Sequence, residues 1–237
     1  GLGDVYKRQR LDRFVAKNLP LLPPALLQKY IRLKRIKVNG KGSKRDVRLE
    51  TGDILQLYIN DEFFDKPNEE NLFLTVFKPQ LNIVYEDENL LLVDKRPGMS
   101  VHADDTEKVN TLINHIQAYL YQKREWNPKW ENAFAPALCN RIDRNTGGIV
   151  IAAKNAETLR IINEKIRAIF GEYLEGDTIF RSGAGDLNIP ASRGVPGVGF
   201  CAYKLGRIHS REEYIDLNSL ENALRASLAV VLSCVND

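Results

Sequence analysis

The chain has 237 residues, 43% of them hydrophobic, which suffices for the core of one large domain or two smaller ones. The net charge of +3 hides an asymmetry, because residues 10–60 carry 12 Lys or Arg against 4 Asp or Glu while residues 61–237 sum to −6. Three widely spaced cysteines exclude a disulfide framework and a zinc knuckle and favour a cytoplasmic location. No apolar run reaches the length of a membrane span.

The first nine residues, GLGDVYKRQ, do not resemble a natural start, and residues 4–9 look like the translation of a transposase adapter used in shotgun sequencing libraries. We therefore treat residues 1–9 as a non-native segment and expect the chain to be a gene fragment.

Residues 10–60 are predicted to form a small compact domain. A helical pattern opens at Arg10 and is broken by the prolines after Leu19, and a second helix is predicted over 25–33. Residues 36–40 read as a strand that enters an Asn-Gly turn, which is the strongest short hairpin signal. A further strand over 54–59 would complete a small sheet.

This helix–helix–hairpin order resembles the small RNA-binding domain first described in a protein of the ribosomal small subunit. In that family the second helix and the following loop carry the basic RNA-binding face. The resemblance implies that RNA phosphates are bound by Arg13, Gln28, Lys29, Arg32, Lys34, Arg35, Lys37, Lys44 and Arg45. A solvated lysine-rich helix face is the alternative interpretation.

Residues 61–80 are polar and rich in turn formers, and we expect a linker there. After it, strands are predicted over 83–85, 90–93 and 149–153, and helices over 111–123 and 156–167. Two histidines of this part, His102 and His115, are assigned no catalytic role.

The most informative stretch is CNRIDRNTGG, residues 139–148. It places Asp143 between Arg141 and Arg144, just before a Thr-Gly-Gly turn and a buried strand. Nearby positive charge favours the ionised form of a carboxyl group, and a positioned carboxylate can act as a nucleophile or a general base. The arginines could hold a phosphate backbone. An ordinary surface salt bridge beside a glycine turn would give the same pattern.

This stretch resembles the signature of the pseudouridine synthases that modify ribosomal and transfer RNA, in the branch acting on the large ribosomal subunit. The family motif reads approximately His-Arg-Leu-Asp-Arg-x-Thr-Ser-Gly, so Asn140, Ile142 and Gly147 depart from it. Residues 87–104, DENLLLVDKRPGMSVHAD, also resemble the first core strand of the family and the turn after it.

The resemblance covers about residues 10–168 and implies that Asp143 is the catalytic residue. It further implies an RNA substrate, ribosomal or transfer RNA, and no cofactor or metal. Asp143 would attack the sugar or the base of an extruded uridine, or remove a sugar proton. Substrate would be bound by Arg141, Arg144, Asn145 and Thr146.

The tail resembles another family. Residues 182–200 and 206–220 look like the last segment of the two-zinc exopeptidases, in which a histidine corresponding to His209 is a terminal zinc ligand. One histidine cannot hold a catalytic zinc, so no metal site is predicted. The simplest hypothesis is a chimera, with a synthase fragment joined near residues 168–180 to a peptidase tail.

The predicted class is α+β: an αα-hairpin-β RNA-binding domain over 10–60, a linker over 61–80, a partial, mainly antiparallel synthase domain with flanking helices over 81–168, and an exopeptidase-like α/β segment over 169–237. The predicted function is uridine-to-pseudouridine isomerisation by an incomplete copy. A non-catalytic RNA-binding module and a fragment of a zinc-dependent exopeptidase are the alternatives.

Overall fold

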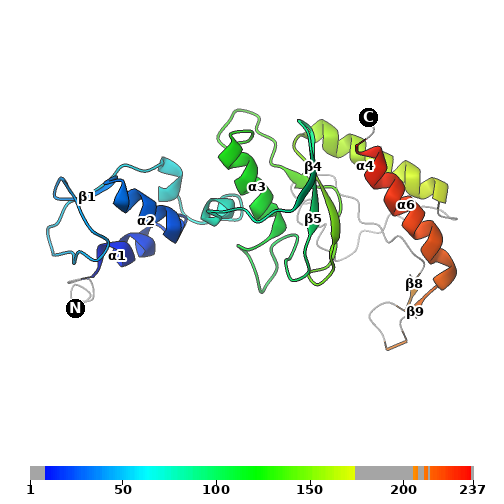
Figure 1. The fold of residues 1–237 in the computed structure, drawn as a ribbon, viewed down its shortest axis with the longest axis horizontal. Helices are drawn as coiled ribbons and strands as arrows, with labels where there is room; N and C mark the ends of the chain where they lie inside the picture. Colours follow the sequence, from blue (N-terminus) through cyan, green and yellow to red (C-terminus); the bar gives the residue numbers. More distant parts are fainter. Residues whose placement is uncertain (1–8, 174–204, 208–210, 213, 236–237) are drawn as a thin grey trace. The chain divides into compact units, whose positions relative to one another are not determined.

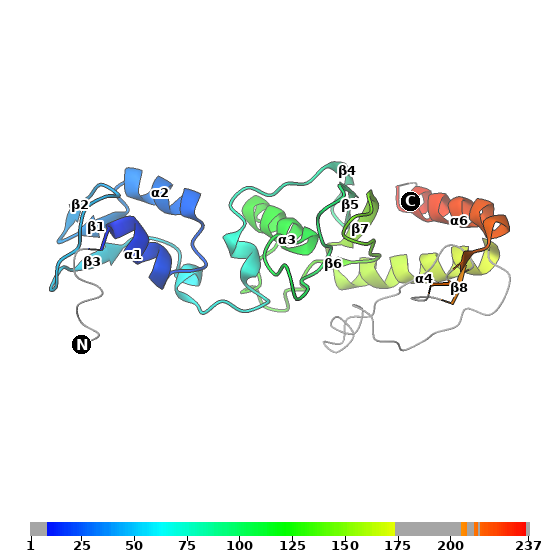
Figure 2. The same cartoon turned by 90° about the horizontal axis from the view of Figure 1, so that it is seen from below.

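A computed structural model describes residues 9–173, 205–207, 211–212 and 214–235 of the chain. The described elements divide into two compact units, shown as ribbons in Figures 1 and 2. The first unit takes the described residues as far as Gln80 together with Ala103–Lys123. The second takes Leu81–His102 and the described residues from Arg124 onward. Within the described residues, no helix has the length and apolarity that crossing a membrane requires.

The first unit opens with two short helices. Helix α1 (Leu11–Asn18) buries Leu11 and Val15. Helix α2 (Pro24–Arg32) starts on a proline, which suits the first helical position because its missing N–H has no acceptor there. Both helices begin and end within two residues of the positions that the sequence pattern predicts.

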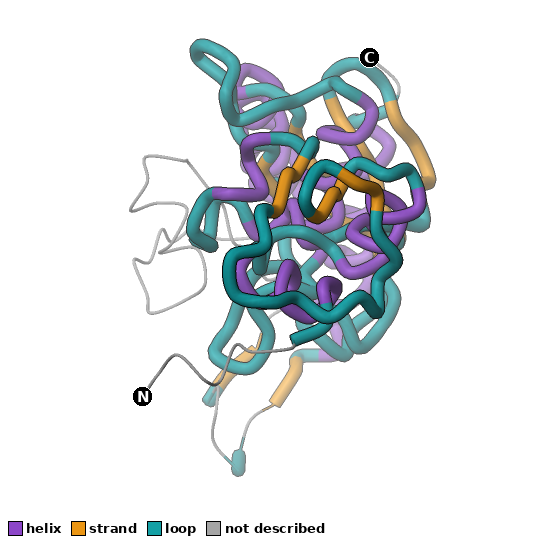
Figure 3. Tube along the Cα trace, turned by 90° about the vertical axis from the view of Figure 1, so that its left-hand side faces the viewer, coloured by secondary structure: helices purple, strands orange, loops and turns teal. Residues whose placement is uncertain are grey.

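A three-stranded antiparallel sheet follows the helices, in the order β2-β1-β3, and Figure 3 shows this unit from its N-terminal side. The strands are β1 (Ile36–Val38), β2 (Lys41–Gly42) and β3 (Leu55–Leu57). The predicted Asn-Gly turn joins β1 to β2, and Asn39 and Gly40 both adopt positive φ, 52° and 78°. That pair of conformations is what a tight two-residue hairpin turn requires.

The segment expected to be a linker, residues 61–80, is packed instead. It contains the 3-10 helices η1 (Asp61–Phe64) and η2 (Leu72–Thr75), which bury Phe63 and Phe73. The ring of Phe73 meets Tyr121 of helix α3 (Leu112–Lys123) edge-on, with ring centroids 5.3 Å apart. The segment is therefore held in place by its few apolar residues, and Phe73 packs against helix α3.

The second unit is built on a four-stranded antiparallel sheet in the order β4-β5-β7-β6. Its long central strands, β5 (Leu90–Lys95) and β7 (Gly148–Ala153), pair over their full length, from Leu90 opposite Ala153 to Lys95 opposite Gly148. Strands β4 (Ile83–Glu86) and β6 (Ala137–Leu138) lie at the edges. All described strand pairs are antiparallel, so the predicted α+β class with a mainly antiparallel sheet is confirmed.

Two helices pack with this sheet. Helix α4 (Ala156–Tyr173) is longer than predicted, because Phe170 continues the buried stripe of Ile162 and Ile166 at four-residue spacing. Helix α6 (Leu220–Ser233) lies alongside α4 in Figures 1 and 2 and contributes Ala226 and Val230 to the same core. Among the described residues, three short elements precede α6: the paired strands β8 (Leu205–Gly206) and β9 (Tyr214–Ile215), and the 3-10 helix η3 (Leu217–Ser219).

Candidate active site

Asp143 lies on the loop of the hairpin formed by β6 and β7. Cys139 extends the pairing beyond β6, because its N–H donates to the carbonyl of Ile151 at 2.7 Å. The loop closes with a turn in which the N–H of Thr146 donates to the carbonyl of Asp143 at 3.0 Å. The Asp143 side chain is exposed at this turn, where a large substrate can reach its carboxylate.

Asn140 fixes the strand that enters this loop. Its side-chain amide donates from Nδ2 to the carbonyl of Ile149 at 3.0 Å, and its Oδ1 accepts from the N–H of Ile151 at 2.8 Å. The amide group thus imitates the two hydrogen bonds of a strand pair. Asn140 departs from the family motif at this position, and it has a clear structural role here.

The turn that follows β5 lies against the Asp143 loop, because the end of β5 pairs with the start of β7. The N–H of Gly98 donates to the carbonyl of Arg144 at 2.7 Å, and Arg144 Nε donates back to the carbonyl of Gly98 at 3.3 Å. Gly147 is also confined, because a Cβ there would lie 3.2 Å from Pro97 Cδ. Segments almost 50 residues apart in sequence therefore form one pair of adjoining loops.

Lys95 connects the two loops through hydrogen bonds from its ammonium group. Its side chain is only 1% exposed, although it is a cation at the end of a strand. The ammonium group donates to three carbonyl oxygens, those of Arg96 at 3.2 Å, Met99 at 2.9 Å and Arg144 at 3.1 Å. All three N–H donors of the group are therefore satisfied by the two turns.

The charge of Asp143 affects the pKa of Lys95. Burial lowers the pKa of the Lys95 ammonium, and the negative charge of Asp143 opposes that shift. Since the three acceptors around Lys95 are neutral, the nearby carboxylate is the charge with which it interacts electrostatically. Sequence reasoning identified the arginines beside Asp143 but missed this lysine. A single cation at the end of the run LLLVD was the available signal.

The other residues predicted to bind substrate lie on the same loop, within three residues of Asp143 in the chain. Arg144, Asn145 and Thr146 are exposed, and Arg141 is half-buried. The loop thus carries polar and cationic residues as well as one carboxylate.

The predicted RNA-binding residues lie in the first unit. Arg13 is exposed on α1, and α2 carries Lys29 and Arg32 exposed beside the half-buried Gln28. The remaining basic residues follow α2 in the chain, and all except the half-buried Lys37 are exposed; they are Lys34, Arg35, Lys37, Lys44 and Arg45. The predicted zinc-ligand analogue His209 lies outside the described residues.

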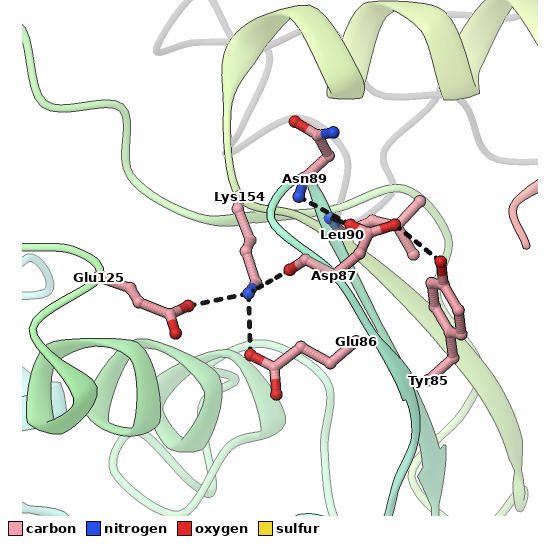
Figure 4. Close-up of polar contacts among 7 residues, drawn as sticks. All are labelled: Tyr85, Glu86, Asp87, Asn89, Leu90, Glu125 and Lys154. Atoms are coloured by element: carbon pink, nitrogen blue, oxygen red, sulfur yellow. Dashed lines mark hydrogen bonds and ion pairs between the residues drawn. The ribbon is translucent and has the colours of Figure 1, made fainter. Parts of the chain in front are cut away.

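The opposite end of the β5–β7 ladder carries a second polar cluster, drawn in Figure 4. Lys154, which follows β7, donates to Glu86 Oε1 at 2.8 Å, Glu125 Oε2 at 2.8 Å and the carbonyl of Asp87 at 2.6 Å. This lysine is neutralised by carboxylates in direct contact.

Asp87, beside Lys154, closes the turn between β4 and β5. Its carboxylate accepts from the N–H groups of Asn89 and Leu90, at 2.7 and 2.8 Å, and from the Tyr85 hydroxyl at 3.0 Å. Burial alone would raise the pKa of Asp87, but these hydrogen bonds together with the charge of Lys154 lower it below the usual value.

Fold and site together define an α+β protein with one accessible carboxylate on a hairpin loop, set among cationic groups. Residues 89–174 match the family described as RNA pseudouridylate synthase. This match contains Asp143 and its whole loop. Over this region the chain is similar to the RNA pseudouridine synthase family.

Curated relatives of this chain also carry the name of pseudouridine synthases. An uncharacterized RNA pseudouridine synthase of Mycoplasma genitalium is 32% identical over 162 residues, which make up 67% of this chain and 48% of that protein. Ribosomal large subunit pseudouridine synthase C of Buchnera aphidicola subsp. Schizaphis graminum is 30% identical over 161 residues, 67% of this chain and 47% of that protein. The chain therefore spans about half the length of the curated relatives that it matches.

A solved structure titled "Crystal structure of pseudouridylate synthase" covers 66% of this chain and 53% of its own. It is 18% identical with a TM-score of 0.20, which is too low to support an argument about the fold.

Proposed function

We propose that this chain converts uridine to pseudouridine in ribosomal or transfer RNA, with Asp143 as the catalytic residue. The observation that carries the proposal is the position of Asp143: an accessible carboxylate on a loop that the buried Lys95 fastens to its neighbour. The family match over 89–174 gives the reaction class.

The reaction breaks the bond between C1′ of the ribose and N1 of uracil and forms a bond from C1′ to C5. The hydrogen on C5 leaves and N1 gains one, so atoms and electrons balance without a cofactor. Such chemistry requires the base to leave its stack. Asp143 then acts on the extruded nucleotide, as a nucleophile or as a base.

Arg141, Arg144, Asn145 and Thr146 hold the nucleotide and its phosphates in this proposal. A guanidinium group can bind a phosphate through two parallel hydrogen bonds, which fixes orientation as well as position. The basic residues of the first unit, from Arg13 to Arg45, supply the wider electrostatic attraction for RNA. They raise the local RNA concentration without reading its sequence.

The experiment follows the hydrogen that leaves C5. The chain is incubated with ribosomal or transfer RNA containing uridine tritiated at C5, and tritium release to water is measured. Asp143→Asn should reduce release by about three orders of magnitude or more, because the reacting group is removed. RNA affinity should change little.

The matched control is Asp94→Asn. Asp94 is the neighbour of Lys95 in the chain, and its carboxylate accepts from Asn82 Nδ2 at 3.0 Å, so this substitution removes a nearby charge outside the loop. Release should persist in this variant. Turnover by Asp143→Asn would remove Asp143 from its proposed role, and a chain that binds RNA without releasing tritium would be an RNA-binding module.

A further inference from the structure

The small sheet of the first unit has one face turned away from its core. Ile36 and Val38 of β1 are buried, so Lys37 between them points to the opposite, outer face. Directly opposite Lys37 lie Gln56 of β3 and Gly42 of β2, and residues paired in this way share a face of the sheet. The outer face therefore carries a lysine in its central strand and a glycine in an edge strand.

Tyr58 adds an aromatic ring to this outer face. It lies two residues after Gln56, and its N–H donates to the carbonyl of Arg35 at 2.8 Å, which continues the sheet pairing beyond β3. The Lys37 ammonium lies 5.0 Å from the centre of the Tyr58 ring. The tyrosine is nevertheless 54% exposed, so much of its surface is open to solvent beside a cation.

Lys34 is held against the same face by an unusual backbone conformation. It follows the end of α2 with φ of 56°, a position where glycine is the common residue. Its stem packs over Gly42, because a Cβ added to Gly42 would lie 2.9 Å from Lys34 Cγ. Gly42 thus leaves room for a lysine stem, on the side of the sheet that carries Lys37.

We propose that this outer face binds a single-stranded segment of RNA, with one nucleobase stacked on Tyr58 and phosphates bound by Lys34 and Lys37. The inference rests on the proposed function, because that function makes RNA the partner. It goes further by naming a binding site for an unpaired base, which the basic residues alone do not imply. Stacking on an aromatic ring tolerates any base but requires that the base be free of its duplex partner.

The positive charge of the outer face favours single-stranded RNA over a protein as its partner. The group beside Tyr58 is the ammonium of Lys37, and residues 10–60 carry a net charge of +8. The centre of a protein–protein interface is depleted of lysine, whereas a cationic surface with an aromatic ring is typical of single-strand binding.

The test uses the full chain and two labelled RNAs with equal numbers of phosphates, a single strand of mixed sequence and a blunt-ended duplex. Fluorescence anisotropy gives the affinity for each. Tyr58→Ala should weaken single-strand binding by about tenfold or more, because one stacked base is lost, and should leave duplex binding unchanged. Tyr58→Phe keeps the ring and should bind as the original chain does.

A matched control tests whether any lysine–tyrosine pair would give the same result. Tyr119 of α3 carries the Lys123 ammonium at 5.1 Å from its ring centre, a geometry close to that at Tyr58. Tyr119→Ala should leave single-strand affinity unchanged. Lys37→Gln should reduce the slope of log affinity against log salt by about one, whereas Tyr58→Ala should leave that slope unaltered.

A second measurement needs no substitution. Single-stranded RNA containing 5-iodouridine is irradiated in complex with the original chain, and the modified residue is located by mass spectrometry. An adduct on Tyr58 supports the proposal. Adducts confined to other residues, or equal single-strand affinity for a folded Tyr58→Ala chain, overturn it.

The two proposals fail separately. If Tyr58 binds the single strand but no tritium is released, then the isomerisation is disproved while this site stands. If tritium is released and Tyr58→Ala binds as before, then only the stacking site is disproved.

Discussion

The buried Lys95 and the partly buried Lys154 lie at opposite ends of the same pair of strands, and their surroundings differ in charge. Lys95, at the end of β5, donates its three N–H groups to the neutral carbonyls of Arg96, Met99 and Arg144. Lys154, just after β7, meets two carboxylates and one carbonyl. Both ammonium groups are fully hydrogen-bonded, yet only the second is neutralised by direct contact.

This difference separates a structural cluster from the loop that we propose to be catalytic. The charge of Lys154 is neutralised by Glu86 and Glu125. The lysine therefore holds the end of β7 in place and has little electrostatic effect on more distant groups. Lys95 is held by neutral carbonyls instead, and its pKa is affected by the charge of Asp143, the exposed carboxylate of the neighbouring loop. A buried cation held by dipoles alone is costly.

Substitution of Lys95 should have the largest effect, on both stability and tritium release. Lys95→Met removes the donor from the carbonyls of Arg96 and Met99 and one of the two donors of the Arg144 carbonyl, and we expect a loss of about 3 kcal/mol in the free energy of unfolding, measured by urea denaturation. Tritium release should also fall, mainly through kcat, because Asp143 loses its nearby cation and its loop loses a fastening. A folded Lys95→Met chain with the original kcat would contradict the positioning role.

Substitution of Lys154 should affect stability alone. Lys154→Met leaves Glu86 and Glu125 facing each other without their cation, but Glu125 is 36% exposed and can be rehydrated. We expect a smaller loss, about 1–2 kcal/mol, in the same urea measurement. Tritium release by the folded variant should equal that of the original chain, and an equal loss of kcat in both lysine variants would erase the contrast.

The contrast between the two ends could be predicted only in part from the sequence. Asp143 was predicted as the catalytic residue because its neighbours in the chain are arginines and the strand after it is apolar, and that role stays a prediction. The Asn39-Gly40 turn was found because the dipeptide itself dictates positive φ. Both signals are local.

Contacts between distant residues gave no such signal. Lys95 meets the carbonyl of Arg144, 49 residues away, only because β5 pairs with β7 in one register. Phe63 and Phe73 were read as parts of a polar linker, because their neighbours are turn formers and their partners lie elsewhere in the chain. Strand pairing and side-chain packing determine these contacts, and neither can be predicted from a short segment of the sequence.

Acid should weaken the structural end of the ladder in a defined direction. The pKa of Asp87 is lowered on folding, so its hydrogen bonds stabilise the chain fully above about pH 4, near the ordinary value, and are lost as pH falls through the lower folded value. Asp87→Asn should lower the unfolding free energy by about 1 kcal/mol at pH 7. The difference between the two chains should shrink between pH 4 and pH 2, and a constant difference would contradict the assignment.

The smallest expected effect concerns His115 of the first unit, a buried residue on α3. Its Nδ1 accepts from the N–H of Gln80 at 2.9 Å, so the ring proton lies on Nε2, which is 2.9 Å from Asn110 Oδ1. Burial lowers the pKa of His115, and protonation would place a second donor against the N–H of Gln80. The neutral ring is therefore the form that the fold requires.

The direction of the pH dependence of stability follows from proton uptake by His115. Below about pH 6.5 the unfolded chain binds a proton at His115 that the folded chain resists, so stability falls as pH drops toward the lower folded value. We expect a decrease of less than about 1 kcal/mol between pH 7 and pH 5.5, measured by urea denaturation. His115→Asn offers the Gln80 N–H an acceptor that does not titrate, so this pH dependence should be smaller in that variant. An unaltered dependence would show that other groups produce it.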